Sequence, residues 1–262
     1  MSDGPGRAGL RPRKELGQHF LVDENILGVI DRLAGPERDD VVLEIGPGLG
    51  VLTRHLAERV ALVHAVEIDA SLAGRLPTLP NVHVVVGDAL RLDLAALDPA
   101  PGKLVSNLPY NVATPIVVES LDGLPTLASW CVMVQREVAD RFFAAPRTKA
   151  YGAVSVLVQL AAERTGFHPV SRTVFRPPPN VDSALVAFRR RPLPERFASV
   201  KRIVEGAFAH RRKTLVNSLE LAGVAPRARG QEALAALGRR ADVRAEALEP
   251  AEFVVLARGL GG

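Results

Sequence analysis

The chain has a single cysteine, no long hydrophobic run and no apolar leader, and each absence excludes a class of protein. The one cysteine, Cys131, rules out an internal disulfide and suits a reducing cytoplasm. It lies in an apolar stretch, so we expect it to pack in the core rather than act as a nucleophile. No run of about 18 apolar residues exists, and the N-terminus lacks a signal core. We therefore expect a cytoplasmic protein without a membrane span.

Charge is modest in total but uneven along the chain. The net charge is +4, yet residues 189–213 hold nine basic and two acidic side chains. An N-terminal arm, residues 1–14, adds further basic side chains: Arg7, Arg11, Arg13 and Lys14. Such clusters indicate a polyanionic partner, and a solvated Arg-rich surface is the alternative interpretation.

Hydrophobic spacing predicts an α/β fold with a parallel sheet. Strands are expected over 41–45, 61–67, 82–87, 103–107 and 130–135, and they alternate with helices over 49–59, 70–76, 114–121 and 136–144. A further helix is expected over 151–162. Residues 175–184 contain three consecutive prolines, so we expect no regular structure there, followed by an edge strand over 184–188.

Beyond a linker at Pro192 and Pro194 the pattern is helical. Helices are expected over 197–209, 212–221, 231–237 and 250–258. The length suits one full α/β domain and a small annex. We predict a flexible basic arm over 1–14, a Rossmann-like domain over 15–191 and a helical, RNA-binding domain over 192–262.

A glycine-rich turn and two acids predict a nucleoside site. The first strand ends in Gly46-Pro-Gly48-Leu-Gly50, where glycine lets the backbone pass close to a ligand. The next two strands end at Glu67 and Asp88. Glu67 suits the two hydroxyls of a ribose. Asp88 suits a polar contact to a base, and equally a helix N-cap.

The spacing of the turn separates two cofactor classes. A dinucleotide site requires G-x-G-x-x-G with the helix N-terminus at a pyrophosphate, but position 51 is Val. S-adenosylmethionine has no phosphate, and it needs a wide glycine turn, an acid for the ribose and a polar partner for the adenine. The sequence favours S-adenosylmethionine over a nicotinamide-linked oxidoreductase.

Asn107-Leu108-Pro109-Tyr110 indicates what is held beside the cofactor. The Asn107 side-chain oxygen and a carbonyl of Leu108-Pro109 are acceptors for a planar base amine, and Tyr110 offers a stacking face. A plain strand end running into a proline turn is the alternative. Phe175, before the stiff proline loop, is expected to clamp the base opposite Tyr110, or otherwise to cover the sheet edge.

These motifs together resemble the rRNA adenine N6-dimethyltransferase family over about residues 14–221. The matching segments are Leu16-Gly-Gln-His-Phe-Leu-Val-Asp-Glu-Asn, Glu44-Ile-Gly-Pro-Gly-Leu-Gly, Val66-Glu-Ile-Asp, Gly87-Asp-Ala, Asn107-Leu-Pro-Tyr-Asn, 175–184 and 207–219. The Asn107 segment and Arg211-Arg-Lys-Thr-Leu look like the housekeeping branch. That branch dimethylates two adjacent adenines near the 3′ end of 16S rRNA.

The resemblance implies a class I S-adenosylmethionine-dependent methyltransferase without a metal. The reaction it implies is in-line displacement at the sulfonium, with the base amine oriented by the protein. It also implies residue roles. The cofactor site comprises His19, Leu21, Gly46, Gly48, Glu67, Asp88 and Asn107. The catalytic residues are Asn107, Leu108, Pro109, Tyr110 and Phe175. Arg211, Arg212 and Lys213 bind RNA, and they cannot all share one helix face.

Two positions depart from the family pattern. Position 19 is His where Asn is common, which suggests a pH-sensitive cofactor contact. Position 216 is Val where Arg is frequent, which suggests one phosphate contact fewer.

The expected partner is 16S rRNA within the small subunit, bound by a monomer with a role in subunit biogenesis. A 23S rRNA methyltransferase of the resistance type and a non-catalytic ribosome assembly factor remain the alternatives.

Overall fold

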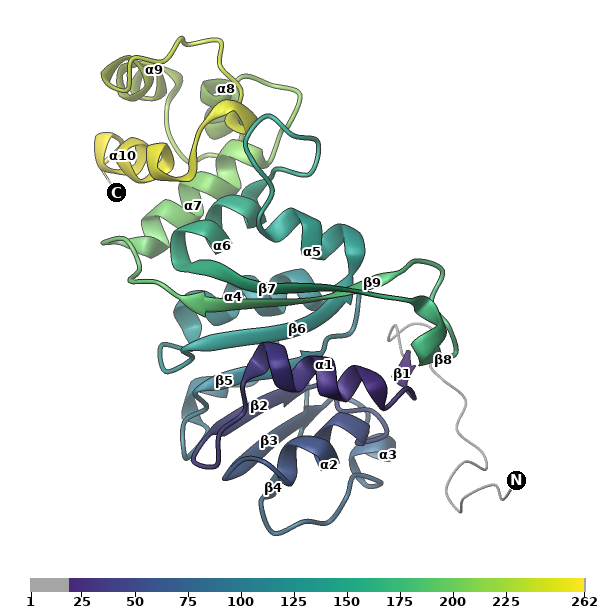
Figure 1. The fold of residues 1–262 in the computed structure, drawn as a ribbon. Helices are drawn as coiled ribbons and strands as arrows, with labels where there is room; N and C mark the ends of the chain where they lie inside the picture. The colour runs from purple at the N-terminus through teal and green to yellow at the C-terminus, as the bar shows by residue number, and fades with distance from the viewer. Residues whose placement is uncertain (1–18, 262) are drawn as a thin grey trace.

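A mixed seven-stranded sheet organises the protein (Figure 1). The computed structural model describes residues 19–261, so the predicted basic arm and Leu16 lie outside the described residues. The strand order is β4-β3-β2-β5-β6-β9-β7. Its members are β2 (Val41–Ile45), β3 (Leu62–Glu67), β4 (Val82–Val86), β5 (Lys103–Asn107), β6 (Ser129–Gln135), β7 (Ala162–Val170) and β9 (Ser183–Arg190). The first five strands in this order are parallel, which confirms the predicted Rossmann-like α/β class.

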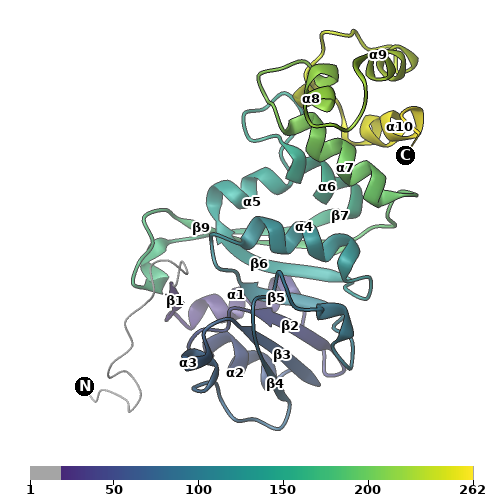
Figure 2. The ribbon, with the colours of Figure 1, turned by 180° about the vertical axis from the view of Figure 1, so that it is seen from behind.

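Helices cover both faces of the sheet because the strands are apolar on both sides. On one face α1 (Asn25–Ala34) and α2 (Val51–Ala57) pack on Val42, Val105 and Met133 (Figure 1). On the other face α4 (Ala113–Gly123) packs on Leu104 and Val132 (Figure 2). The remaining sheet helices are α3 (Ala70–Ala73), α5 (Arg136–Phe142) and α6 (Ala153–Ala161). Alternate residues of each strand therefore serve two different hydrophobic clusters.

Four helices follow the sheet and pack beyond α6 (Figure 1). They are α7 (Phe197–Phe208), α8 (Leu215–Leu221), α9 (Arg227–Ala236) and α10 (Pro250–Gly259). Their apolar side chains, Leu219 and Phe253 among them, belong to the same hydrophobic cluster as α4 and α6. The helical end of the molecule is therefore continuous with one face of the sheet. None of the described helices is both long and apolar enough to cross a bilayer.

The structure corrects the predicted end of the sheet. The segment Ala162–Val170, for which no strand was predicted and whose first residue was expected to end a helix, is strand β7, and it occupies the sheet edge. Strand β9 is therefore an inner strand between β6 and β7, antiparallel to both, and not the predicted edge strand. Helix α1 was not predicted at all. Cys131 is buried in β6, as predicted, and burial raises the pKa of its thiol to about 12.

The Pro-rich stretch also contains structure that the sequence did not predict. Phe175–Arg176 forms the short strand β8, which pairs antiparallel with β1 (Phe20–Leu21). The pairing places Leu21 opposite Phe175. It brings the N-terminal segment to the carboxyl ends of the parallel strands, beside the glycine turn.

One half-buried guanidinium ties the last strand to α4. Arg190 donates to the carbonyl oxygens of Leu121 at 2.6 Å and Leu124 at 2.7 Å, and also to that of Leu127. Its guanidinium carbon lies 4.9 Å from the centre of the Trp130 ring. Arg190 therefore satisfies carbonyls at the end of α4 that have no partner inside the helix.

Arg190→Met is expected to lower the free energy of unfolding by about 2–4 kcal/mol, because the partly buried carbonyls lose charged donors. Denaturant unfolding measures this loss. The matched control is Arg189→Met, which removes an exposed pair with Glu163 and should cost under about 1 kcal/mol. Equal losses in the two variants would contradict a structural role specific to Arg190.

Candidate active site

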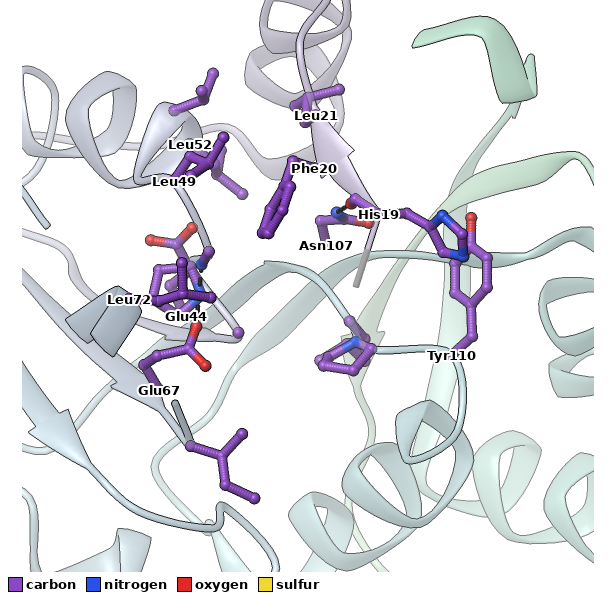
Figure 3. Close-up of a pocket in the computed structure, with 17 residues that line it drawn as sticks. His19, Phe20, Leu21, Glu44, Leu49, Leu52, Glu67, Leu72, Asn107 and Tyr110 are labelled. Carbon is purple, nitrogen blue, oxygen red and sulfur yellow. Dashed lines mark hydrogen bonds between the residues drawn. The ribbon is translucent and has the colours of Figure 1, made fainter. Parts of the chain in front are cut away.

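The pocket lies where the strand order reverses. The chain runs from β2 outward to β3 and β4, then returns to β5 on the other side of β2. In open α/β sheets ligands bind at this point, outside the carboxyl ends of the strands. The pocket is lined from β1, the glycine turn after β2, the end of β3 and the segment after β5 (Figure 3).

The glycine turn needs its glycines. Gly46, Gly48 and Gly50 have φ values of 73°, 57° and 72°, in the left-handed region. A Cβ on Gly46 would lie 3.0 Å from Pro109, and one on Gly48 would lie 2.9 Å from the Phe20 ring. Both conformation and close contact therefore exclude side chains at the positions predicted to approach the cofactor.

Glu67 ends β3 inside the pocket and is only 4% exposed. Its Oε2 accepts the backbone N–H of Gly48 at 3.1 Å, and its Oε1 accepts that of Asp69 at 3.0 Å. Burial raises the pKa of this carboxyl, and the two backbone donors act against the rise. Each oxygen keeps a further lone pair, so the carboxylate can accept two hydroxyls at once.

Glu44 is a pocket residue that sequence reasoning missed. It lies on β2, is 2% exposed, and its Oε2 has no hydrogen-bond partner in the described structure. Burial, with a smaller contribution from nearby Glu67, raises the pKa of Glu44 to about 8. An acid inside an apolar strand is the signal that marked this residue in the sequence. Such an uncompensated carboxyl is costly unless a ligand cation or donor meets it.

The segment after β5 presents acceptors toward the pocket. The Asn107 Nδ2 donates to the His19 carbonyl at 3.2 Å, which leaves its Oδ1 as an acceptor. The Pro109 carbonyl accepts the Val112 N–H at 3.1 Å, whereas no residue from 19 to 261 donates to the Leu108 carbonyl. The predicted pair of amine acceptors is thus Asn107 Oδ1 and Leu108 O.

Tyr110 stands at the mouth of the pocket, half-buried, with its hydroxyl hydrogen-bonded to Ser183 (Figure 3). Burial raises the pKa of this phenol, so it stays neutral. The His19 ring lies 5.3 Å from the Tyr110 ring, tilted by 33°. Its Nδ1 is 2.9 Å from the Pro177 carbonyl, which fixes Nδ1 as the donor. His19 thus links the pocket to the proline loop.

Phe175 does not supply the predicted second stacking face. Its side chain is fully buried among Leu21, Val174 and other members of the α1 cluster, because the β1–β8 pairing covers it. The expectation of an exposed Phe175 ring is therefore wrong in this structure. Leu21, predicted to line the cofactor site, does line the pocket, and so does its neighbour Phe20, which sequence reasoning missed.

Asp88 lies apart from the pocket-lining residues. It begins the turn after β4, where its Oδ1 accepts the Leu90 N–H at 3.0 Å and its Oδ2 lies 3.5 Å from Arg91. No described helix begins at Asp88, so the alternative interpretation of this residue as a helix N-cap is wrong, and its carboxylate closes a turn instead. Its predicted contact to an adenine ring stays a prediction.

The predicted RNA-binding residues are far along the chain, between α7 and α8. Arg211, Arg212 and Lys213 are exposed. Val216, however, is buried and lies 3.0 Å from where a Cβ of Gly230 would be. The side chain at 216 faces the helical core, and the expectation of one phosphate contact fewer at this position stays a prediction.

The residues present fit S-adenosylmethionine. This cofactor carries a sulfonium, an ammonium and a ribose diol, and the pocket offers two buried carboxyls, one with an orphaned oxygen. The glycine turn leaves backbone close to the cavity and presents no phosphate site of the dinucleotide kind. Glu67 would hold the ribose, and Glu44 a positive group of the amino acid part. The Rossmann-like sheet and this pocket define a class I S-adenosylmethionine-dependent methyltransferase.

Comparisons with known proteins assign the family. The family described as "Ribosomal RNA adenine dimethylase" matches residues 9–252, and the chain belongs to it. "Ribosomal RNA small subunit methyltransferase A" of Rubrobacter xylanophilus is 49% identical, over 95% of each chain. The crystal structure of "23S rRNA methyltransferase ErmE" is 31% identical, with a TM-score of 0.63, and covers 93% of this chain and 100% of its own.

A third relative supports the fold alone. A dimethyladenosine transferase from Plasmodium falciparum is 23% identical, with a TM-score of 0.73, over 91% of this chain and 96% of its own. The fold expected from the sequence, and the family it resembled, are thereby confirmed.

Glu67→Ala is expected to weaken S-adenosylmethionine binding by about 1.5–3 kcal/mol, because charged hydrogen bonds to the ribose are lost. Calorimetry measures the affinity. Glu58→Ala, which removes an exposed acid at the end of α2, is the matched control and should bind normally. Unchanged affinity in the Glu67 variant would remove this residue from the site.

Glu44 is expected to make cofactor binding release a proton. Below about pH 8 the carboxyl is largely protonated in the free protein, and a bound cation favours its ionised form. Affinity should therefore rise by up to about tenfold between pH 6 and pH 7. Calorimetry in buffers of different ionisation enthalpy counts the protons. Glu44→Gln should abolish the release; a release that persists in this variant would assign it to another group.

Proposed function

We propose that this protein transfers methyl groups from S-adenosylmethionine to adenine N6 in the 16S rRNA of the small ribosomal subunit. Two adjacent adenines near the 3′ end would each be dimethylated, in support of subunit biogenesis. Relatives 49% and 46% identical carry the name "Ribosomal RNA small subunit methyltransferase A". ErmE, a 23S rRNA methyltransferase, is 31% identical. Sequence similarity therefore favours the small-subunit substrate over the large-subunit alternative.

The observation that carries the proposal is the acceptor pair beside the cofactor pocket. Asn107 Oδ1 and Leu108 O lie at the end of β5, on the segment that lines the pocket with Glu44 and Glu67. An exocyclic amine has two hydrogens, and two acceptors can hold both of them. The same two oxygens stabilise positive charge that develops on that nitrogen. An assembly factor without catalysis would have no need of this arrangement.

The residues of this chain orient the adenine amine, and the cofactor supplies an activated methyl group on its sulfonium. Tyr110 offers a neutral aromatic face, which its bond to Ser183 holds in place. The His19 ring, which is hydrogen-bonded to Pro177, lies against the Tyr110 ring and leaves only its other face for a base. A target adenine must leave its stack to reach this position. Orientation of the amine is then the main contribution of the protein.

RNA contacts, oligomeric state and location belong to the same proposal. We assign residues 192–262 to RNA binding, with Arg212 and Lys213 as exposed phosphate contacts at the start of α8. Arg211 is partly engaged, since its guanidinium donates to the Tyr151 carbonyl at 3.0 Å. The protein would act as a monomer in the cytoplasm, where small subunits are assembled.

Asn107→Ala is expected to lower methyl-transfer turnover by about 10²-fold or more, while S-adenosylmethionine affinity stays within a few-fold. The physical reason is the loss of one amine acceptor and of the bond to the His19 carbonyl. Transfer of labelled methyl to isolated, undermethylated small and large subunits measures turnover. Wild-type protein should label the small subunits alone.

Two results would contradict the proposal in different ways. Labelling of large subunits would favour the resistance-type activity. Wild-type turnover in Asn107→Ala, with the control Asn81→Ala also normal, would show that Asn107 does not orient the amine. Asn81 bonds the carbonyls of Ala57 and Val60 at the base of α2, outside the pocket.

A further inference from the structure

The connection between α5 and α6 is fastened to the C-terminal helices. Arg211 donates to the Tyr151 carbonyl at 3.0 Å and to the Lys149 carbonyl at 3.4 Å. The backbone N–H of Arg147 donates to the Glu246 carbonyl at 2.8 Å. These bonds join a loop of the sheet to the turn before α8 and to the segment before α10. The exposed side chains of Arg147 and Lys149 therefore project from the same junction as Arg212 and Lys213.

The acids near this junction already have partners. Glu252 makes a two-pronged pair with Arg239, at 2.6 and 2.9 Å, and Glu246 lies 3.7 Å from Arg211. Within residues 19–261, no carboxylate lies at ion-pair distance from four cations: Arg147, Lys149, Arg212 and Lys213. The hydrogen bonds and charge of Arg239 and, to a smaller extent, the charge of Arg147 hold the pKa of Glu252 below its usual value. Exposed cations that form no ion pair create a positive surface that attracts polyanions.

A groove lies next to this surface. It has a volume of about 620 Å³ and is lined by Ala150 from the loop, by Arg136 and Arg172, and by three acids, Glu137, Asp140 and Asp182. Asp182 directly precedes Ser183, whose hydroxyl bonds Tyr110, so the groove reaches from the loop to the segment that carries the partner of Tyr110. Because the groove itself carries both signs of charge, phosphate contacts are expected at its loop end, on Arg147 and Lys149.

The backbone of Arg147 supports a specific role for the loop. Its φ is 66°, in the left-handed region that a residue with a Cβ rarely adopts. Such a conformation persists only where surrounding contacts enforce it, here the bond to Glu246 and the neighbouring Arg211 bonds. The loop is held in one shape before any partner arrives, which lowers the ordering cost of binding.

We propose that Arg147 and Lys149 form a second phosphate-binding element, which grips the RNA strand leading away from the target adenine. They act as one surface with Arg212 and Lys213, and Arg211 is a positioning residue that holds the loop. This inference rests on the proposed function, because the polyanion is taken to be the RNA that carries the target base. It adds a contact from the sheet side of the molecule to those at the start of α8.

The test compares binding of full-length variants to purified, undermethylated small subunits across a salt series. Arg147→Ala combined with Lys149→Ala should bind at least several-fold more weakly. Its log–log salt slope should be shallower by roughly 1.4–2, since each lost phosphate contact removes about 0.7–1. Arg212→Ala with Lys213→Ala should show a similar change. S-adenosylmethionine affinity should stay unchanged in both.

The control and the positioning variant separate charge from structure. Arg38→Ala with Arg54→Ala makes the same change in net charge at two exposed positions before β2 and on α2, outside the segment assigned to RNA binding, and should leave the slope as in wild type. Arg211→Lys keeps the charge but loses the forked donor. It should weaken binding and speed amide hydrogen exchange over residues 147–151, a readout that phosphate contact alone would not move.

Three results would overturn the inference. If the Arg147/Lys149 variant binds with wild-type affinity and slope while wild type methylates small subunits, the loop does not contact RNA and the proposed function stands. Weaker binding with an unchanged slope would mean that the loop meets a protein surface instead of phosphate. If wild type neither binds nor methylates small subunits, the proposed function and this inference both fail.

Discussion

A buried carboxylate held by two backbone N–H groups sets the geometry of the whole pocket. Glu67 receives hydrogen bonds from Gly48 at 3.1 Å and from Asp69 at 3.0 Å, so the end of β3 is tied to the turn that follows β2. The Gly48 backbone approaches closely only because it lacks a Cβ, which would lie 2.9 Å from Phe20. Through Phe20 the constraint reaches β1, and through β8 the proline loop. The cofactor pocket and the proposed base site thus share one support.

Burial gives this pocket its chemical character. Removing Glu44 and Glu67 from water raises the pKa of both carboxyls, to about 8 for Glu44, so in the free protein the negative charge of Glu44 is held back below that pH. A bound cationic cofactor favours the ionised carboxylate, because its positive charge stabilises the negative charge that water no longer reaches. The pocket is therefore selective for a positively charged nucleoside rather than for a dinucleotide with its phosphates. The base side, in contrast, is built from neutral oxygens and the Tyr110 ring, which suits an amine that gains charge only as it reacts.

Much of the sheet was predictable from hydrophobic runs, and the strand over 103–107 was predicted to the residue. Strand β7 was missed because Gly166 and Pro169 lie within it, and only its pairing with β9 makes it a strand. Phe175 was expected to be exposed because the local pattern is a stiff loop, but pairing with Leu21, distant in sequence, buries it. The sequence predicts Glu44 only as an ordinary strand residue. Its lack of a hydrogen-bond partner, which marks it as a pocket residue, is visible only in three dimensions. Local pattern thus predicted the parallel strands of the sheet, whereas long-range pairing decided strand β7 and the burial of Phe175.

The most direct measurement is the position of the methyl groups. Undermethylated small subunits are incubated with the protein and S-adenosylmethionine, and the extracted 16S rRNA is mapped by mass spectrometry. We expect dimethylated adenine at two adjacent positions near the 3′ end, and far slower methylation of the same adenines when Asn107→Ala replaces wild type. Methylation at a base other than adenine, or in 23S rRNA alone, would contradict it.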